Sequence, residues 1–128
     1  MNYYVSKILK TSFNDALARV EAALADQGFE ILSDIDVQEV LGNTLKVTFR
    51  NYRILGVCNP LFAHKALLTE DKIGTMLPCN VIVQEKTEGR VEAAFVNLIA
   101  SMIEIENTAL MDMVGQVQHK IGKVIDQL

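Results

Sequence analysis

The sequence predicts an α+β domain in which helices pack on one face of a mainly antiparallel sheet. Short segments rich in β-branched and aromatic residues alternate apolar and polar positions, as half-buried strands do. An amphipathic helical pattern follows the first of these segments, and a longer helical pattern ends the chain. Helices set apart from a run of strands are typical of the α+β class.

The first part of the chain predicts a strand, a helix and a second strand. Residues 3–9 alternate and contain many β-formers, which indicates a strand. Residues 13–24 place apolar side chains at spacings of three and four, after a capping Ser12. Gly28 stands where a left-handed residue would end this helix. Residues 29–37 alternate again and predict the second strand.

The next part gives a weaker pattern before a buried strand. Residues 38–43 are ambiguous, and Gly42 with Asn43 forms a turn signal. Residues 45–49 alternate and predict a short strand or an extended segment. Residues 52–58 form a more continuous apolar run, which is typical of a more buried strand.

A short helix is predicted after this strand. Asn59 is a suitable cap, and Pro60 suits the first helical position, so residues 61–68 should be helical. Residues 69–72 are polar and should turn the chain, and Pro78 should end any helix before it.

The last part predicts a hairpin and a long helix. Residues 79–85 and 90–95 read as two strands joined by the turn signal Thr87-Glu88-Gly89. The helical segment covers about residues 101–128, with a cap at Asn107 and an apolar stripe that repeats every three or four residues. This stripe fits packing on the core, and a dimer seam is the alternative.

Composition narrows the class of protein. A chain of 128 residues has the length of one domain, so residues 1–128 are expected to share one core. The net charge of −4 argues against nucleic-acid binding, which usually needs a basic surface. No apolar run approaches the roughly 18 residues of a membrane span, and the N-terminus lacks the pattern of a signal peptide. We therefore expect no membrane partner and a cytoplasmic location.

Both cysteines lie in the stretch from residue 52 to 83, each followed by an asparagine. Cys58 should lie where a strand ends and a helix begins, and the positive end of a helix dipole favours a reactive thiolate. Cys79 should open a neighbouring strand, so the two sulfurs could approach each other if the strands pair antiparallel. The alternative is that both are small buried apolar residues, a common fate of free cysteine.

His64 follows Cys58 by six residues and could join both cysteines in a three-ligand metal site. The chain has no C-x-x-C and no H-x-x-x-H, so this spacing assigns no metal. A Cys–His nucleophile pair is also conceivable, but the sequence identifies no orienting acid or amide. A partly exposed helical His64 is the simpler interpretation. The sequence leaves enzymatic activity and any cofactor undetermined.

The central motifs resemble a known family. The run Tyr52-Arg53-Ile54-Leu55-Gly56-Val57-Cys58-Asn59-Pro60, then Ala63, Ala66-Leu67, Ile73-Gly74 and Leu77-Pro78-Cys79-Asn80-Val81, is similar to the bacterial and archaeal family catalogued as domain of unknown function number 302. The resemblance covers roughly residues 3–96. The residues that match by motif are Asn59, Pro60, Gly74, Pro78, Cys79 and Asn80.

The resemblance implies a fold like that of the TATA-binding protein, strand–helix–four strands–helix, often seen as a homodimer. It implies no activity, since function depends on the site and not on the fold. Two features depart from the family pattern: residues 95–98 lack an Asp-Pro pair at the end of the hairpin, and residues 107–128 carry no family motif.

Together these observations lead to one main hypothesis and two rivals. The main hypothesis is a domain that binds a small ligand or a partner in a cleft at the ends of the two Cys-Asn strands. The residues expected to form this cleft are Cys58, Asn59, Cys79 and Asn80, with His64 at its rim. One rival is a thiol-dependent sulfur or redox enzyme or carrier, and the other is a structural homodimer subunit.

Overall fold

The computed structural model describes residues 2–128 and shows a five-stranded antiparallel sheet with the strand order β1-β5-β4-β3-β2. The strands are β1 (Tyr4–Leu9), β2 (Glu30–Asp36), β3 (Tyr52–Cys58), β4 (Cys79–Thr87) and β5 (Arg90–Val96). The helices are α1 (Phe13–Asp26), α2 (Val37–Leu45), α3 (Pro60–Thr69), α4 (Leu98–Met102) and α5 (Thr108–Asp126), with a 3₁₀ helix η1 (Asp71–Met76). The predicted α+β class is confirmed.

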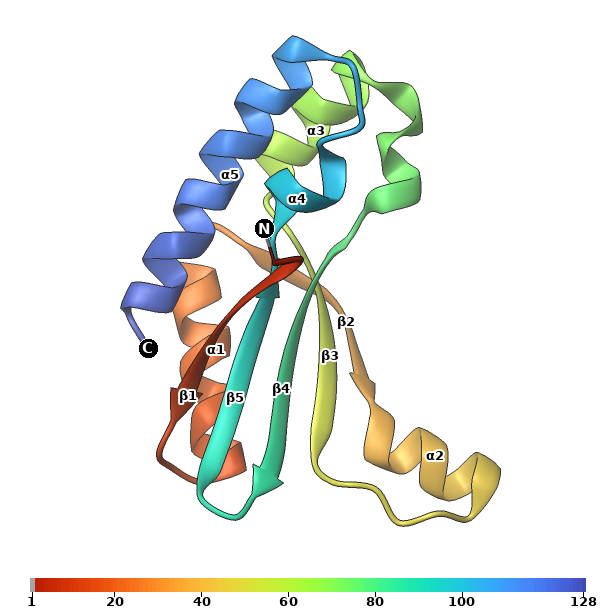
Figure 1. Cartoon of the computed structure of the whole chain (residues 1–128), viewed down its shortest axis with the longest axis vertical. Coiled ribbons are helices and arrows are strands. Elements are labelled where there is room, and N and C mark those ends of the chain that lie inside the picture. The colour runs from red at the N-terminus through yellow and green to blue at the C-terminus, as the bar shows by residue number, and fades with distance from the viewer. Residues whose placement is uncertain (1) are drawn as a thin grey trace.

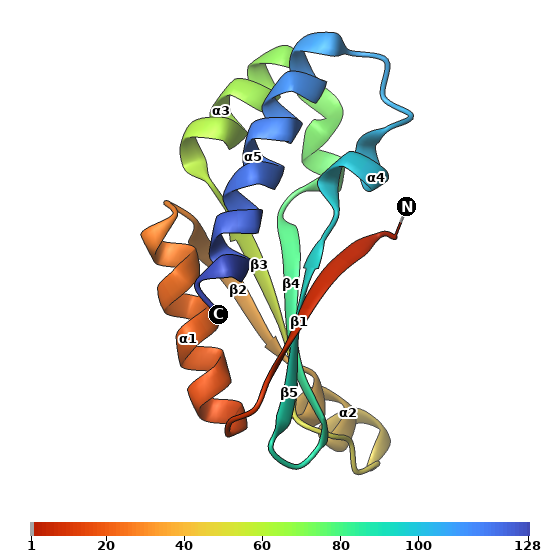
Figure 2. The same ribbon diagram turned by 60° about the vertical axis from the view of Figure 1, so that its left-hand side comes forward.

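Helices α1 and α5 cover one face of the sheet, and α3, η1 and α4 gather beyond its upper end (Figures 1 and 2). The core lies between this helical layer and the three central strands. Leu55, Val57, Val81, Val83 and Phe95 are almost fully buried there. Successive strand residues point to opposite faces, so this odd-numbered set defines the covered face.

Helix α1 forms where several local signals agree. The Ser12 hydroxyl accepts a hydrogen bond from the Asp15 backbone N–H at 3.2 Å, which satisfies one free donor at the helix start. The apolar stripe that includes Ala16 and Val20 is fully buried against the sheet. The helix ends before Gly28, whose φ of +81° is the left-handed conformation that glycine adopts at little cost. Both the predicted helix and its end are confirmed.

The predicted strand at residues 45–49 is wrong. Helix α2 occupies residues 37–45 and the chain then runs as a loop back to β3. The Asp36 carboxylate begins the helix by accepting a hydrogen bond from the Glu39 backbone N–H at 3.1 Å, and Lys46 ends it with a φ of +58°. No residue of α2 is buried, and the helix projects from the lower end of the sheet, away from α1. We call residues 37–51 the projecting arm.

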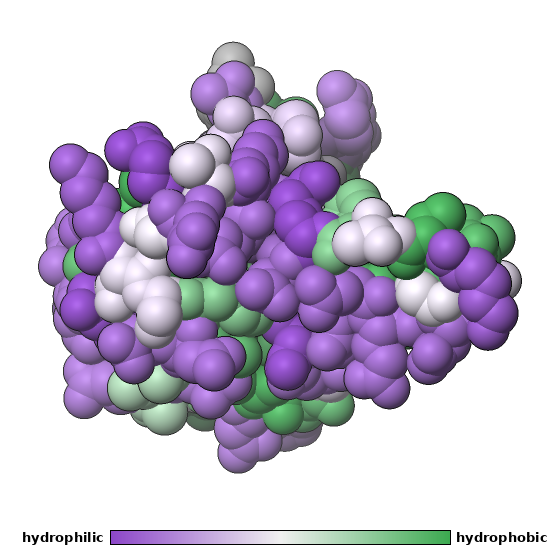
Figure 3. All heavy atoms as spheres, turned by 90° about the horizontal axis from the view of Figure 1, so that it is seen from below, coloured by the Kyte–Doolittle hydropathy of each residue, from purple (hydrophilic) through white to green (hydrophobic). Residues whose placement is uncertain are grey.

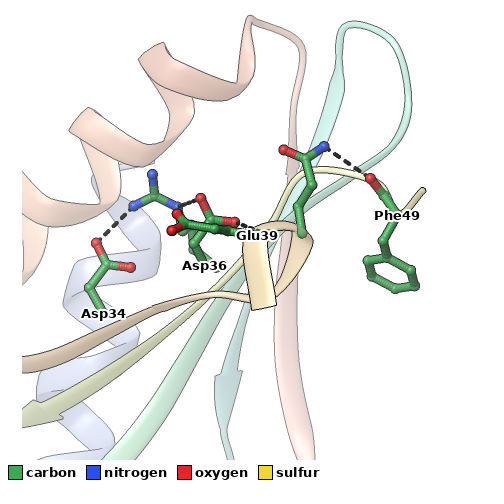
Figure 4. A network of polar contacts seen from close by, with 6 residues as sticks. Asp34, Asp36, Glu39 and Phe49 are labelled. Atoms are coloured by element: carbon green, nitrogen blue, oxygen red, sulfur yellow. Dashed lines mark hydrogen bonds and ion pairs between the residues drawn. The ribbon is translucent and has the colours of Figure 1, made fainter. Parts of the chain in front are cut away.

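A polar network fixes the base of the projecting arm (Figure 4). The Arg53 guanidinium lies 2.8 Å from Asp34 Oδ2 and 3.5 Å from Asp36 Oδ2. Gln38 Nε2 donates to the backbone oxygen of Phe49 at 2.9 Å, which joins the start of the arm to its returning loop. These contacts give the arm a defined direction even though it buries little surface.

The C-terminal segment forms two helices. The Asn107 side chain caps α5 by accepting a hydrogen bond from the Leu110 N–H at 3.1 Å, as the sequence predicts. Leu110, Val114, Ile121 and Val124 of α5 are buried in the core. The apolar stripe of α5 is therefore used inside the chain, as core packing requires. Within residues 2–128, no helix is both long and apolar enough to cross a membrane.

Candidate functional site

The two cysteines lie at the same end of neighbouring strands. β3 and β4 pair antiparallel, with Val57 opposite Cys79, so Cys58 at the end of β3 lies one residue from the start of β4. From the sequence, the two sulfurs could approach each other only if their strands were adjacent and antiparallel, and β3 and β4 are paired in this way. Both cysteines are free thiols.

A cavity of about 50 Å³ lies beside these strand ends and is partly open to solvent. Its floor is formed by Val57, Cys58 and Cys79, and its walls come from α3, η1, α4 and α5. Its lining residues are Phe29, Val57, Cys58, Asn59, Phe62, Ala63, Ala66, Ile73, Leu77, Cys79, Leu98, Met102, Leu110, Met113, Val114 and Val117. Apart from the Asn59 amide and the two thiols, the lining side chains are hydrocarbon or thioether.

The cavity exists because the upper helices stand off the end of the sheet. Helix α3 packs on η1 and α5, and the side chains that α3 turns inward include the small Ala63 and Ala66. Larger residues at these two positions would fill the space, because protein interiors are otherwise close-packed. The gap is therefore a consequence of two alanines on one helix face, three residues apart.

Burial shifts the pKa of both thiols upward. Burial, with a smaller contribution from the neighbouring Cys58, raises the pKa of Cys79 to about 11. Burial also raises the pKa of Cys58, with a second contribution from the Glu30 carboxylate, which lies opposite Cys58 in the register of β2 and β3. This upward direction is opposite to the effect expected from the positive end of the α3 dipole, and it favours the alternative of neutral, partly buried thiols.

Asn59 holds the position that the sequence predicts but makes a different contact. It stands at the start of α3, before Pro60, and its side chain makes no capping hydrogen bond. Its Nδ2 instead donates to the backbone oxygen of Gln27 at 3.5 Å, beyond the end of α1. This long contact orients the amide at the edge of the cavity.

Asn80, expected to line the cleft, and His64, expected at its rim, are both absent from the cavity lining. Asn80 is exposed on the uncovered face of the sheet, because it follows the inward-facing Cys79 along the same strand. His64 is exposed on α3 and does not line the cavity, whereas its neighbour Ala63 does. Within residues 2–128, no group of three His, Cys, Asp or Glu side chains is placed to hold a metal ion.

The sequence interpretation missed the helical half of the cavity. Met102 comes from α4 and Met113 from α5, both far from the cysteines along the chain. The one available signal was that Met113 neighbours the buried stripe of α5 at Leu110 and Val114. That signal marks core packing in general and does not point to a cavity.

The fold and the cavity define the class: a small α+β domain whose antiparallel sheet is covered on one face and whose helices enclose a sulfur-lined cavity at one sheet end. The sequence profile of the family described as "Domain of unknown function DUF302" matches residues 5–128. The chain therefore belongs to the DUF302 family. The match includes the C-terminal helices α4 and α5.

Two individual proteins are similar to this chain. An uncharacterized protein of Aquifex aeolicus is 26% identical over 95 residues, which are 74% of this chain and only 60% of that protein. The crystal structure of an uncharacterized conserved DUF302 protein from Bacillus stearothermophilus is 22% identical, with a TM-score of 0.91 over 99% of this chain and 98% of that one. The latter similarity shows that the two chains share a fold.

Proposed function

We propose that this chain is a binding domain that holds a small ligand in the cavity lined by Cys58, Asn59 and Cys79. The observation that carries the proposal is the cavity itself, which lies where two strand ends meet the helical layer. It brings three of the five residues predicted from the sequence to one place. Concave, mainly apolar sites with a few polar groups are typical of small-ligand binding.

The size of the cavity limits what it can hold. Its volume of about 50 Å³ is roughly a third of the ~150 Å³ engineered cavity that binds benzene. Pockets for drug-sized ligands usually span about 300–1,000 Å³. The ligand is therefore one or a few atoms across, unless α3 moves outward when it binds.

The thiol-enzyme rival has less support. A nucleophilic cysteine needs a lowered pKa, and both cysteines have a raised one. His64, the partner that a Cys–His pair would use, is exposed outside the cavity. The raised thiol pKa values and the position of His64 outside the cavity therefore support ligand binding better than nucleophilic catalysis.

Xenon is a suitable probe of the cavity because it is monatomic and apolar. Amide NMR spectra recorded under xenon pressure should show saturable shifts at Cys58, Cys79 and Val114. The variant Ala66→Leu should abolish these shifts by filling the cavity. The control Ala109→Leu adds the same atoms to an exposed position of α5 and should leave them unchanged. Absence of shifts in the wild type, or equal shifts in Ala66→Leu, would contradict the proposal.

A second candidate function, a homodimer subunit, is supported by the uncovered face of the sheet. A hollow of about 490 Å³ lies there, and all three tyrosines of the chain line it: Tyr3, Tyr4 and Tyr52. We call this region the open-face hollow. Tyrosine is enriched in protein interfaces, where its ring is buried and its hydroxyl stays wet.

The floor of the open-face hollow is polar but internally paired. Gln84 is only 7% exposed, its oxygen accepts from Arg50 Nε at 2.9 Å, and its amide donates to Glu92 at 2.8 Å. A partner can therefore cover this residue without leaving its amide unsatisfied. Lys86 and Glu92 place both signs of charge in the hollow.

The projecting arm is the complementary surface. It exposes Val40, Leu45 and Val47, and it stands out from the body as an apolar patch in Figure 3. One chain thus carries both an unfilled hollow and an apolar arm with no buried residue in its helix. We infer that a second copy of the chain covers these surfaces.

Sedimentation equilibrium tests the dimer. The variant Leu45→Lys places a charge on the arm at a residue that is 62% exposed, so it should convert the dimer to a folded monomer. The control Leu68→Lys changes a residue on α3 that is 75% exposed and should remain dimeric. A monomeric wild type, or a dimeric Leu45→Lys variant, would contradict this candidate.

A further inference from the structure

Four of the residues that line the cavity contain sulfur. Two cysteines and two methionines line it: Cys58 from the end of β3, Cys79 from the start of β4, Met102 from α4 and Met113 from α5. The other lining side chains are hydrocarbon, except for the amide of Asn59. Four sulfur-containing residues from four separate elements therefore line a space of about 50 Å³.

This donor set is selective by chemistry. Thiolate and thioether ligands favour soft ions such as Cu(I), whereas carboxylate, carbonyl and water ligands favour Mg²⁺, Ca²⁺ and Mn²⁺. Zinc sites use cysteine, histidine and carboxylate ligands, and within residues 2–128 no three such side chains are grouped for a metal. Iron–sulfur clusters usually need four cysteines, and this chain has two.

The size of the space agrees with the chemistry. A bare metal ion is one of the few ligands that a cavity of about 50 Å³ can take without rearrangement. Methionine has three rotatable bonds, so Met102 and Met113 can turn toward an ion held by the cysteines. The apolar wall would also keep water away from the bound metal, so that water does not compete with the sulfur ligands.

We propose that this cavity binds a single soft monovalent metal ion, Cu(I), through the two cysteine sulfurs with thioether support from Met113 and Met102. The inference rests on the proposed function, because it identifies the ligand of the same cavity. Binding joins Cu⁺ to the two thiols as two Cu–S bonds and releases two protons to solvent. Copper stays Cu(I) throughout, so no oxidant or reductant is consumed.

Anaerobic competition with a coloured Cu(I) chelator, bathocuproine disulfonate, measures this binding directly. The full-length protein should take one equivalent of Cu(I) from the chelator, and sulfur should be the ligand atom in copper X-ray absorption spectra. Cys79→Ser and Cys58→Ser should each weaken binding at least about tenfold, since even supporting residues of metal sites contribute that much.

Methionine variants separate the cavity from nonspecific sulfur binding. Met113→Leu keeps side-chain volume and should weaken Cu(I) binding without unfolding the chain. The control Met111→Leu lies on the same helix, outside the cavity lining, and should bind as the wild type does. Equal affinities for Met113→Leu and Met111→Leu would remove the thioether part of the assignment.

The outcomes distinguish this inference from the proposed function. If xenon enters the cavity but one equivalent of Cu(I) is not retained, the metal assignment fails and small-ligand binding survives. If neither enters, both fail. Cu(I) retained equally by the wild type and both serine variants would place the metal outside the cavity and overturn the inference.

Discussion

Deprotonation of Cys79 should destabilise the fold by an amount that follows from its burial. The side chain is 9% exposed, and its pKa is raised from 9.0 to about 11. Below pH 9 the thiol is neutral in both the folded and the unfolded chain, so its contribution to stability is fully present. As the pH rises toward 11, the unfolded chain loses the proton first and this stability is lost.

The expected magnitude is modest but measurable. Between pH 8 and pH 10 the free energy of unfolding should fall by about 1 kcal/mol through this thiol alone, because one pKa unit corresponds to ~1.4 kcal/mol. Urea unfolding of the wild type and of Cys79→Ala at both pH values isolates the contribution of this thiol to the free energy of unfolding. The variant lacks the thiol, so its stability should fall by about 1 kcal/mol less than that of the wild type.

A matched control separates titration from packing. Val83→Ala removes buried atoms from the same strand, at a fully buried position, without removing a titratable group. Its loss of stability between pH 8 and pH 10 should equal that of the wild type. If Cys79→Ala also loses as much as the wild type, the buried, protonated thiol described here is refuted.

Three further predictions concern the scaffold. Gly56→Ala should lower the free energy of unfolding by about 1–3 kcal/mol, because the new Cβ would overlap the Ser33 hydroxyl and lie 2.9 Å from Pro78 Cγ. In Gly122→Ala the new Cβ meets no atom within 4 Å, so this variant should raise the free energy of unfolding by up to ~1 kcal/mol. Thermal unfolding of the Gly56 and Gly122 variants measures both changes. Ser12→Ala removes the cap of α1 and should cost about 1 kcal/mol in the same assay.

The sequence predicted those elements in which independent local signals agree. Helix α1 has a cap at Ser12, a buried stripe and a terminating Gly28, and each acts through neighbouring residues. Residues 45–49 lacked such agreement. Their alternation suits a strand, but a strand forms only with a partner, and residues 46–51 instead run as the loop between α2 and β3.

Part of the candidate site could be predicted from the sequence, because strand pairing and strand alternation follow from local patterns. The closeness of Cys58 and Cys79 follows from strand pairing, which the sequence could state only as a condition. The outward direction of Asn80 follows from strand alternation once Cys79 faces inward. The contributions of Met102 and Met113 depend on how α4 and α5 pack, and no local pattern encodes that packing.

The most direct test of a functional cavity is a crystal structure determined under xenon pressure. The account predicts a xenon peak enclosed by Cys58, Cys79, Ala66 and Val114, which is lost in crystals of Ala66→Leu. A structure with no xenon between the strand ends and α3, or with xenon bound only elsewhere, would contradict the claim that this cavity receives a ligand.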